Sequence, residues 1–164
     1  SMKMEFPDSL KFTTANGRTV YGGGGITPDV YVPIDTNGTS EYFWDVLRKG
    51  IVNKFCLNYV DKHRKQLSKY YKNINAFDQN FEIDDVFLQE FIKFAEKEKV
   101  KRNDDGILKS REVLSTRIKA LIARNLYDEE AYYIIINKSL NDPFKKAVEI
   151  FQTNQYDLLI NKSK

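Results

Sequence analysis

Two side chains of one predicted helix are of the types that form a nucleophile and its general base. Ser115 and Lys119 lie four positions apart, which brings a hydroxyl and an amine to the same face of a helix. A lysine acts as a base only where its surroundings desolvate the amine, and a serine nucleophile also needs an oxyanion-binding turn nearby. The neighbouring sequence offers neither feature. We therefore interpret Ser115 and Lys119 as a surface pair, and we predict no catalytic residue in this chain.

The segment from Lys101 to Glu112 partly matches a calcium-binding loop. Asn103, Asp105 and Gly106 occupy the third, fifth and sixth places of the loop template, and Glu112 occupies the twelfth. The first place needs a carboxylate ligand, but it holds Lys101, whose positive charge repels the ion. We therefore predict a polar connection between two helices here and no metal site.

Four lysines recur at spacings of three and four residues and fall on one face of a long predicted helix: Lys62, Lys65, Lys69 and Lys72. Such a row could contact the phosphates of a nucleic acid. Because the chain has 26 basic and 23 acidic residues, we interpret the row as a solvated face and predict no nucleic-acid partner. His63, the single histidine, lies on the apolar side of the same helix and is predicted to be half-buried. With no second histidine to share a metal ion, no metal or cofactor is predicted.

Four consecutive glycines, from Gly22 to Gly25, stand shortly before Pro28-Asp29. A phosphate-binding loop would need Lys followed by Ser or Thr after its last glycine and then a helix, and neither follows here. A flexible linker would mix serine with glycine, whereas β-branched and aromatic residues flank this run. The run therefore predicts a structural turn in which at least one glycine has a positive φ angle.

Short β-prone segments surround the glycine run. Residues 11–14 and 18–21 flank Asn16-Gly17, which is the strongest short-range signal for a tight hairpin. Residues 30–33 are also rich in valine and are predicted to form a further strand. Residues 1–35 are therefore predicted to be a hairpin followed by a lone strand.

The residues from Phe12 to Arg18 and from Val20 to Val30 carry a family resemblance. They resemble the segment downstream of the active site in carboxyl-terminal processing peptidases, also called tail-specific proteases, whose closing strand has Gly-Ile-Thr-Pro-Asp followed by alternating valine. The resemblance covers residues 8–34, and the helical remainder resembles the C-terminal extension of some bacterial members. The motif positions are Asn16, Gly17, Arg18, Gly22, Gly23, Gly24, Gly25, Pro28 and Asp29.

The resemblance implies a fragment of an enzyme. Such peptidases use a serine nucleophile and a lysine base, both upstream of the glycine segment, and a PDZ domain that grips the substrate. The Gly-Lys-Gly context of that lysine does not occur in this chain. The parent is thus expected to be a serine-type endopeptidase of the periplasm or cell envelope, and this fragment alone to be inactive. Its partners would be the upstream protease and PDZ domains, with a protein partner or self-association through the helical part.

Two other classes of function stay open: a free-standing helical module that binds a protein, and a nucleic-acid binder that uses the lysine row. Length and composition allow one hydrophobic core, since 41% of the 164 residues are hydrophobic. Cys56, the single cysteine, excludes an internal disulfide and is predicted to be buried on an apolar helix face. No window approaches eighteen continuous apolar residues, so no membrane span is predicted.

Beyond a polar link at residues 35–39, the hydrophobic period changes from two to about three and a half, which predicts helices. Gly50 is expected to end or kink the first helix, and Trp44 to anchor its packing. Aspartates are expected to cap later helices at Asp84 or Asp85, at Asp128 and at Asp142. Apolar residues mark helices at about 43–47, 51–70, 85–101, 113–122, 131–136 and 144–151.

The predicted fold class is therefore mainly α, with a small bundle of about five helices. A short β-hairpin and strand, which would belong to the protease core of the parent, precede the bundle. We expect two domains: the β segment over residues 1–35 and a C-terminal helical domain over residues 36–164.

Overall fold

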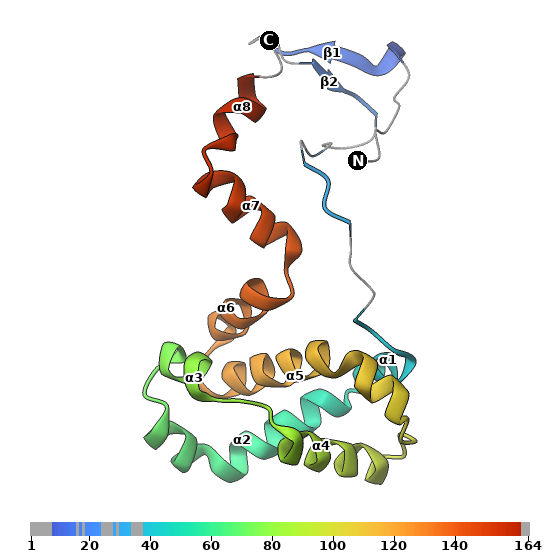
Figure 1. Ribbon diagram of the computed structural model, residues 1–164, viewed down its shortest axis with the longest axis vertical. Helices are drawn as coiled ribbons and strands as arrows, with labels where there is room; N and C mark the ends of the chain where they lie inside the picture. Colours follow the sequence, from blue (N-terminus) through green and yellow to red (C-terminus); the bar gives the residue numbers. More distant parts are fainter. Residues whose placement is uncertain are drawn as a thin grey trace. The chain divides into compact units, whose positions relative to one another are not determined.

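The computed structural model describes residues 8–15, 17, 19–23, 28, 30–33 and 38–161. The described part is mainly helical, with eight α-helices and one short antiparallel hairpin (Figure 1), which confirms the predicted fold class. The bundle has more helices than the five or so that we predicted. The chain divides into two compact units: residues 35–141, called the helical unit below, and residues 1–34 with 142–164, called the terminal unit.

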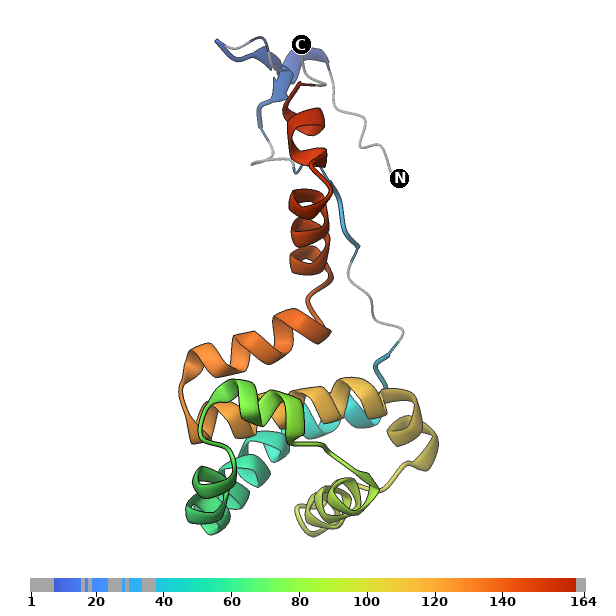
Figure 2. The same ribbon diagram turned by 60° about the vertical axis from the view of Figure 1, so that its left-hand side comes forward.

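Six helices make up the helical unit. The longest, α5, packs against α1, α2 and α6, and α4 packs against α2 (Figures 1 and 2). Their bounds are α1 (Glu41–Arg48), α2 (Ile51–Tyr70), α3 (Ile74–Asn80), α4 (Asp85–Lys97), α5 (Asp104–Leu126) and α6 (Glu129–Ser139).

Polar side chains fix where these helices begin. Asp84 and Asp128 each accept a hydrogen bond from the backbone N–H three residues ahead, as predicted, and they are the N-caps of α4 and α6. Asn73 and Asn103 cap α3 and α5 in the same way. Gly50, at φ 68°, separates α1 from α2. A residue with a side chain would be strained there, so the predicted break at Gly50 is confirmed.

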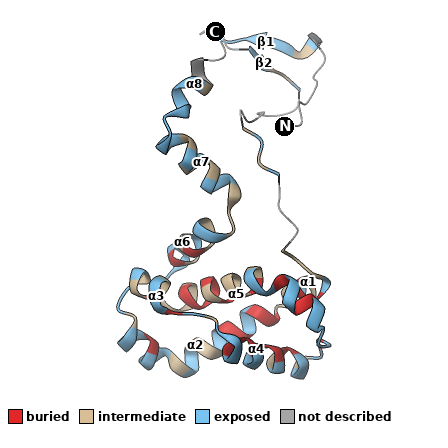
Figure 3. Ribbon diagram, viewed as in Figure 1, coloured by how far each residue is buried: buried red, intermediate tan, exposed pale blue. Residues whose placement is uncertain are grey.

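Aromatic rings fill the core between α2 and α4. The ring centroid of Phe55 lies 5.3 Å from that of Phe91 and 5.7 Å from that of Phe87, both edge-on. Cys56, on the next position of α2, is fully buried as predicted and lies 3.6 Å from the carbonyl oxygen of Ile118. The buried residues, red in Figure 3, lie in the helical unit, and no described residue of the terminal unit is buried.

The terminal unit holds a hairpin and two helices. Strands β1 (Lys11–Thr13) and β2 (Thr19–Tyr21) pair antiparallel, with Phe12 opposite Val20, which confirms the predicted hairpin. A 3₁₀ turn at Asp8–Leu10 precedes β1. Helices α7 (Asp142–Gln152) and α8 (Gln155–Asn161) group with residues 1–34, although we had assigned them to the domain 36–164. The start of α7 at Asp142 agrees with its predicted start.

Four local predictions were wrong. Residues 30–33 form no strand, because no described segment pairs with them. Residues 104–112 are the first turns of α5 instead of a polar connection. Trp44 is 45% exposed and does not anchor the packing of α1, since Tyr42, Phe43 and Val46 supply its buried face. Helix α3 was not predicted at all.

Replacing Tyr42 with phenylalanine is expected to leave the free energy of unfolding unchanged or raise it by about 1 kcal/mol. Tyr42 is 3% exposed, and its hydroxyl has no hydrogen-bond partner among the described residues. Burial, and then the charge of Glu96, raises the pKa of Tyr42 to about 12, so the hydroxyl stays neutral and its desolvation is uncompensated. Urea denaturation of the two proteins measures the difference. A loss of more than about 1 kcal/mol would mean that the hydroxyl has a partner in solution.

Candidate functional site

Of the described motif residues, Gly17 lies in the turn of the hairpin, and Gly22 and Gly23 follow β2 directly. The backbone N–H of Gly17, at φ 79°, donates to the carbonyl oxygen of Thr14 at 2.9 Å and closes the turn. Gly22 donates to the carbonyl oxygen of Leu10 at 2.7 Å, and Gly23 has φ 92°. The prediction of a positive φ within the glycine run is thus confirmed. Five motif positions lie outside the described residues: Asn16, Arg18, Gly24, Gly25 and Asp29.

The hairpin is open on both sides. Phe12 is 58% exposed and its cross-strand neighbour Val20 is 39% exposed, so the one apolar pair of the hairpin is not covered. A two-stranded hairpin without a covered face is only marginally stable in water. Among the described residues, no further strand pairs with the hairpin.

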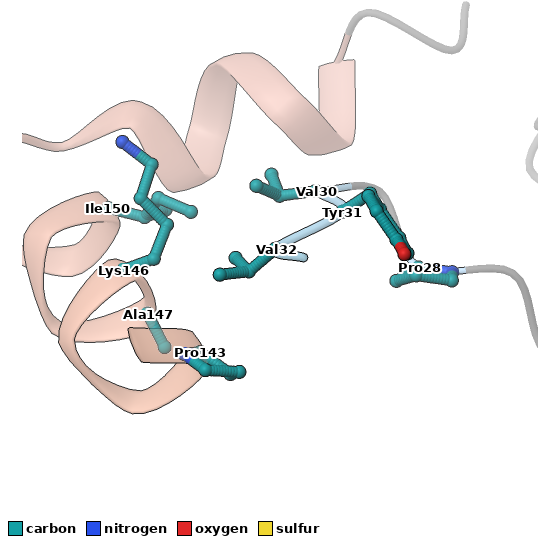
Figure 4. Close-up of a pocket in the computed structure, with 8 residues that line it drawn as sticks. All are labelled: Pro28, Val30, Tyr31, Val32, Pro143, Lys146, Ala147 and Ile150. Atoms are coloured by element: carbon teal, nitrogen blue, oxygen red, sulfur yellow. The ribbon is translucent and has the colours of Figure 1, made fainter. Parts of the chain in front are cut away.

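An extended segment lies against α7 in the terminal unit. Figure 4 shows Val30 and Val32 directed towards the helix and Tyr31 directed away from it. Together with Pro28 they line an open apolar groove, whose other wall consists of Pro143, Lys146, Ala147 and Ile150. Within the described part, the backbone groups of Val30, Tyr31 and Val32 make no hydrogen bond. The segment therefore has strand-like alternation and unused backbone donors and acceptors.

The pair Ser115 and Lys119 has no arrangement for catalysis. The ammonium of Lys119 donates to the backbone carbonyl oxygen of Asp78 at 2.6 Å and lies 3.4 Å from its carboxylate. An amine held by a carbonyl oxygen and a carboxylate is not positioned to take a proton from Ser115. Its side chain is 19% exposed, so our interpretation of a surface pair was wrong about its position. The hydroxyl of Ser115 is buried and has no partner in the described part.

Asp78 joins three helices of the helical unit. Its side chain on α3 is 15% exposed and also accepts a hydrogen bond from Lys138 of α6 at 2.7 Å, while Lys119 comes from α5. Partial burial alone would raise the pKa of the Asp78 carboxyl. The hydrogen bond from Lys138 and the charge of Lys119 outweigh burial and hold this pKa below its ordinary value. No pattern in the sequence predicted this cluster.

Replacing Asp78 with asparagine is expected to lower the free energy of unfolding by about 1–2 kcal/mol at neutral pH, because two ammonium groups lose their carboxylate. The depressed pKa means that the wild-type contribution is present above the unfolded-state pKa and is lost as the pH falls through the folded-state pKa. The stability difference between the wild type and Asp78→Asn should therefore begin to shrink as the pH falls through about 4, and it should vanish only below the folded-state pKa. Urea denaturation across this pH range is the measurement.

A matched control for Asp78 is Asp45→Asn. Asp45 is 41% exposed and pairs only with Arg48 on the same helix, so its replacement should change the free energy of unfolding by less than about 0.5 kcal/mol. Equal losses for the two variants would contradict a linking role of Asp78.

The lysine row and His63 lie on α2 or directly after its end. Lys62, Lys65, Lys69 and Lys72 are all exposed, which confirms a solvated row, although α2 ends before the last of them. His63 is half-buried as predicted, with its ring centroid 4.6 Å from that of Tyr59.

Three of the residues that match the calcium-loop template lie in the first turns of α5: Asp105, Gly106 and Glu112. Asn103 is the N-cap of α5, and Asp104 pairs with Arg102 at 2.7 Å. No group of three or more histidine, cysteine, aspartate or glutamate side chains gathers within the described residues in a way that could hold a metal ion.

A model for a family of unknown function, DUF8443, matches residues 42–128, just over half of the chain. The chain belongs to this family. The DUF8443 match starts in α1 and ends at the N-cap of α6, so it falls wholly within the helical unit. No curated protein and no solved structure matches the chain. The motif positions of the peptidase resemblance lie in residues 8–34, outside the DUF8443 match, and the family description names no function for the helical region. Among the described helices, none is long and apolar enough to cross a membrane.

Proposed function

We propose that this chain is the C-terminal, non-catalytic region of a serine-type peptidase of the carboxyl-terminal processing type. In the parent, an upstream serine and lysine would cleave proteins near their C-termini, in the periplasm or cell envelope. The observation that carries the proposal is the terminal unit, which combines the family-like sequence with a hairpin of which no described residue is buried.

The geometry of the terminal unit supports the view that its hairpin joins a larger sheet in the parent. The two strands of the hairpin have three residues each and an uncovered apolar pair, and such a hairpin gains stability by joining further strands. The extended backbone of Val30, Tyr31 and Val32 also has donors and acceptors to offer. Upstream protease strands would pair with these groups and cover Phe12 and Val20.

The helical unit would brace the protease core or mediate contacts with another protein or a second copy. It has a core of its own, and it also presents large apolar side chains to solvent, among them Val86 at 70%, Leu108 at 74% and Tyr133 at 52% exposure. No catalytic constellation accompanies them in the described part. The chain alone is therefore expected not to hydrolyse peptides.

The deciding experiment determines where the native polypeptide begins in its own organism. An antibody raised against residues 35–141 would isolate it, and mass spectrometry would map its N-terminus. We expect a longer polypeptide with a serine and a lysine of the peptidase type upstream of Lys3, which cleaves unstructured protein C-termini and loses this activity when that serine becomes alanine. A native protein that begins next to Lys3 would contradict the proposal.

One observation favours a second candidate, a free-standing helical module that binds a protein. The DUF8443 match is confined to the helical unit, which has its own hydrophobic core. A native start next to Lys3 would favour this candidate. In that case, cooperative unfolding of residues 35–141 expressed alone is expected.

A further inference from the structure

Arg117 stands apart from the other arginines that the structure describes. Each of those five has a carboxylate oxygen within 4.0 Å: Arg48, Arg64, Arg102, Arg111 and Arg124. Arg117 is half-buried on α5 and has no such carboxylate within the described part. A partly desolvated guanidinium without an anion is costly, since burial disfavours an unpaired charge.

The donors of Arg117 are incompletely used. Its Nη1 donates to the hydroxyl oxygen of Tyr132 on α6 at 3.3 Å. Its Nε is buried and has no acceptor in the described residues. A guanidinium carries five N–H donors and accepts no hydrogen bond, so this side chain needs acceptors only.

Tyr132 adds another donor at the same place. Because an arginine can only donate, the hydroxyl oxygen of Tyr132 accepts from Arg117, and its own proton is directed elsewhere. No described residue accepts that proton. The guanidinium of Arg124 lies over the ring of the same tyrosine, 5.9 Å from its centroid. Its nearest carboxylate, that of the exposed Glu129, is 4.0 Å away, at the limit of an ion pair.

We propose that Arg117 and Tyr132 form a binding site for an oxyanion group, a carboxylate or a phosphate, with Arg124 as a second positive charge. The Nε of Arg117 and the hydroxyl proton of Tyr132 have no acceptor among the described residues, and of the two guanidinium groups only that of Arg124 has a carboxylate nearby, at 4.0 Å. An oxyanion accepts several hydrogen bonds and carries the opposite charge, and arginine binds it through parallel N–H donors. Arg117 and Arg124 lie within the DUF8443 match and Tyr132 follows shortly after its end at residue 128, and the site does not depend on the proposed peptidase.

The test titrates the full chain with inorganic phosphate and, separately, with acetate, at constant ionic strength set with sodium chloride. The side-chain Nε–H resonance of Arg117 is followed by ¹H–¹⁵N NMR. A saturable shift with phosphate alone would identify a phosphate site, one with acetate alone a carboxylate site, and one with both a general oxyanion site. Each of these supports the proposal. A shift that is linear in anion concentration, or that chloride reproduces, would overturn it.

Two conservative variants test the assigned groups. Tyr132→Phe keeps the ring under Arg124 but removes the hydroxyl donor. Arg117→Lys keeps the positive charge but removes the parallel N–H donors of the guanidinium. Each variant should weaken anion binding by about tenfold. Because Arg117→Lys removes the Nε–H probe, its affinity is measured from the backbone amide resonances of α5 and α6. The matched control is Arg64→Lys, because Arg64 is exposed and pairs with Asp61 on its own helix. Unchanged affinity in Tyr132→Phe and Arg117→Lys would refute the site.

Discussion

Replacing Phe55 with alanine is expected to lower the free energy of unfolding of the helical unit by about 3–5 kcal/mol. Phe55 of α2 is 7% exposed, and its ring centroid lies within 6 Å of those of Phe87, Phe91 and Phe94 on α4. The substitution would leave a cavity between the two helices, and a close-packed core collapses around a cavity only in part. Urea denaturation of the full chain, followed by circular dichroism, measures the loss.

The matched control for Phe55 is Tyr70→Ala on the same helix. Tyr70 is 68% exposed, so its replacement should change the free energy of unfolding by no more than about 0.5 kcal/mol. If Phe55→Ala cost no more than this control, α2 and α4 would not form the core described here.

The helix starts of the bundle were largely predictable, because the capping residue acts locally. Asp84 and Asp128 each accept a hydrogen bond from the backbone N–H three residues ahead. A short polar residue directly before a periodic apolar segment is enough to predict such a helix start. Asn103 caps α5 in the same way, but we predicted a polar connection over this segment, so the first turns of α5 were missed. The two acidic residues after Asn103 also suit the first turn of a helix.

Helix α3 was missed for a different reason. Seven residues span only two turns, too few for a periodic apolar pattern to be recognised, and so short a helix is not stable by itself. It is held by tertiary contacts. Phe77 is fully buried and stacks on Phe81 at a centroid distance of 4.5 Å. Only its cap, Asn73, gave a signal in the sequence.

The polar clusters could not be predicted, because they join residues distant in sequence. Asp78 meets Lys119 and Lys138 from α5 and α6, and Arg117 meets Tyr132 across the α5–α6 contact. No local spacing in the sequence predicts contacts between side chains of different helices. Residues 30–33 show a related limit. Their valines predicted a strand, but a strand requires a partner, and no described segment pairs with them.

Replacing Gly23 with valine is expected to destabilise the intact peptidase that we propose by about 1–3 kcal/mol, the usual scale of strained backbone. Gly23 has φ 92°, where a β-branched residue meets steric conflict between its side chain and its own backbone. Peptide cleavage should fall in parallel with folding. The melting temperature and the cleavage rate are measured on the same purified variants.

Gly22→Val separates backbone strain from crowding. A Cβ at Gly22 would lie 2.8 Å from a ring carbon of Phe12, but that ring is 58% exposed and can turn away, and the φ of Gly22 is not in the left-handed region. A structural turn therefore predicts a larger fall in melting temperature for Gly23→Val than for Gly22→Val. A mobile gate over a substrate channel predicts instead an unchanged melting temperature with altered turnover. If valine at each of the four glycines left the melting temperature unchanged, the structural turn would be refuted, because strain at a fixed positive φ cannot be relieved without loss of stability.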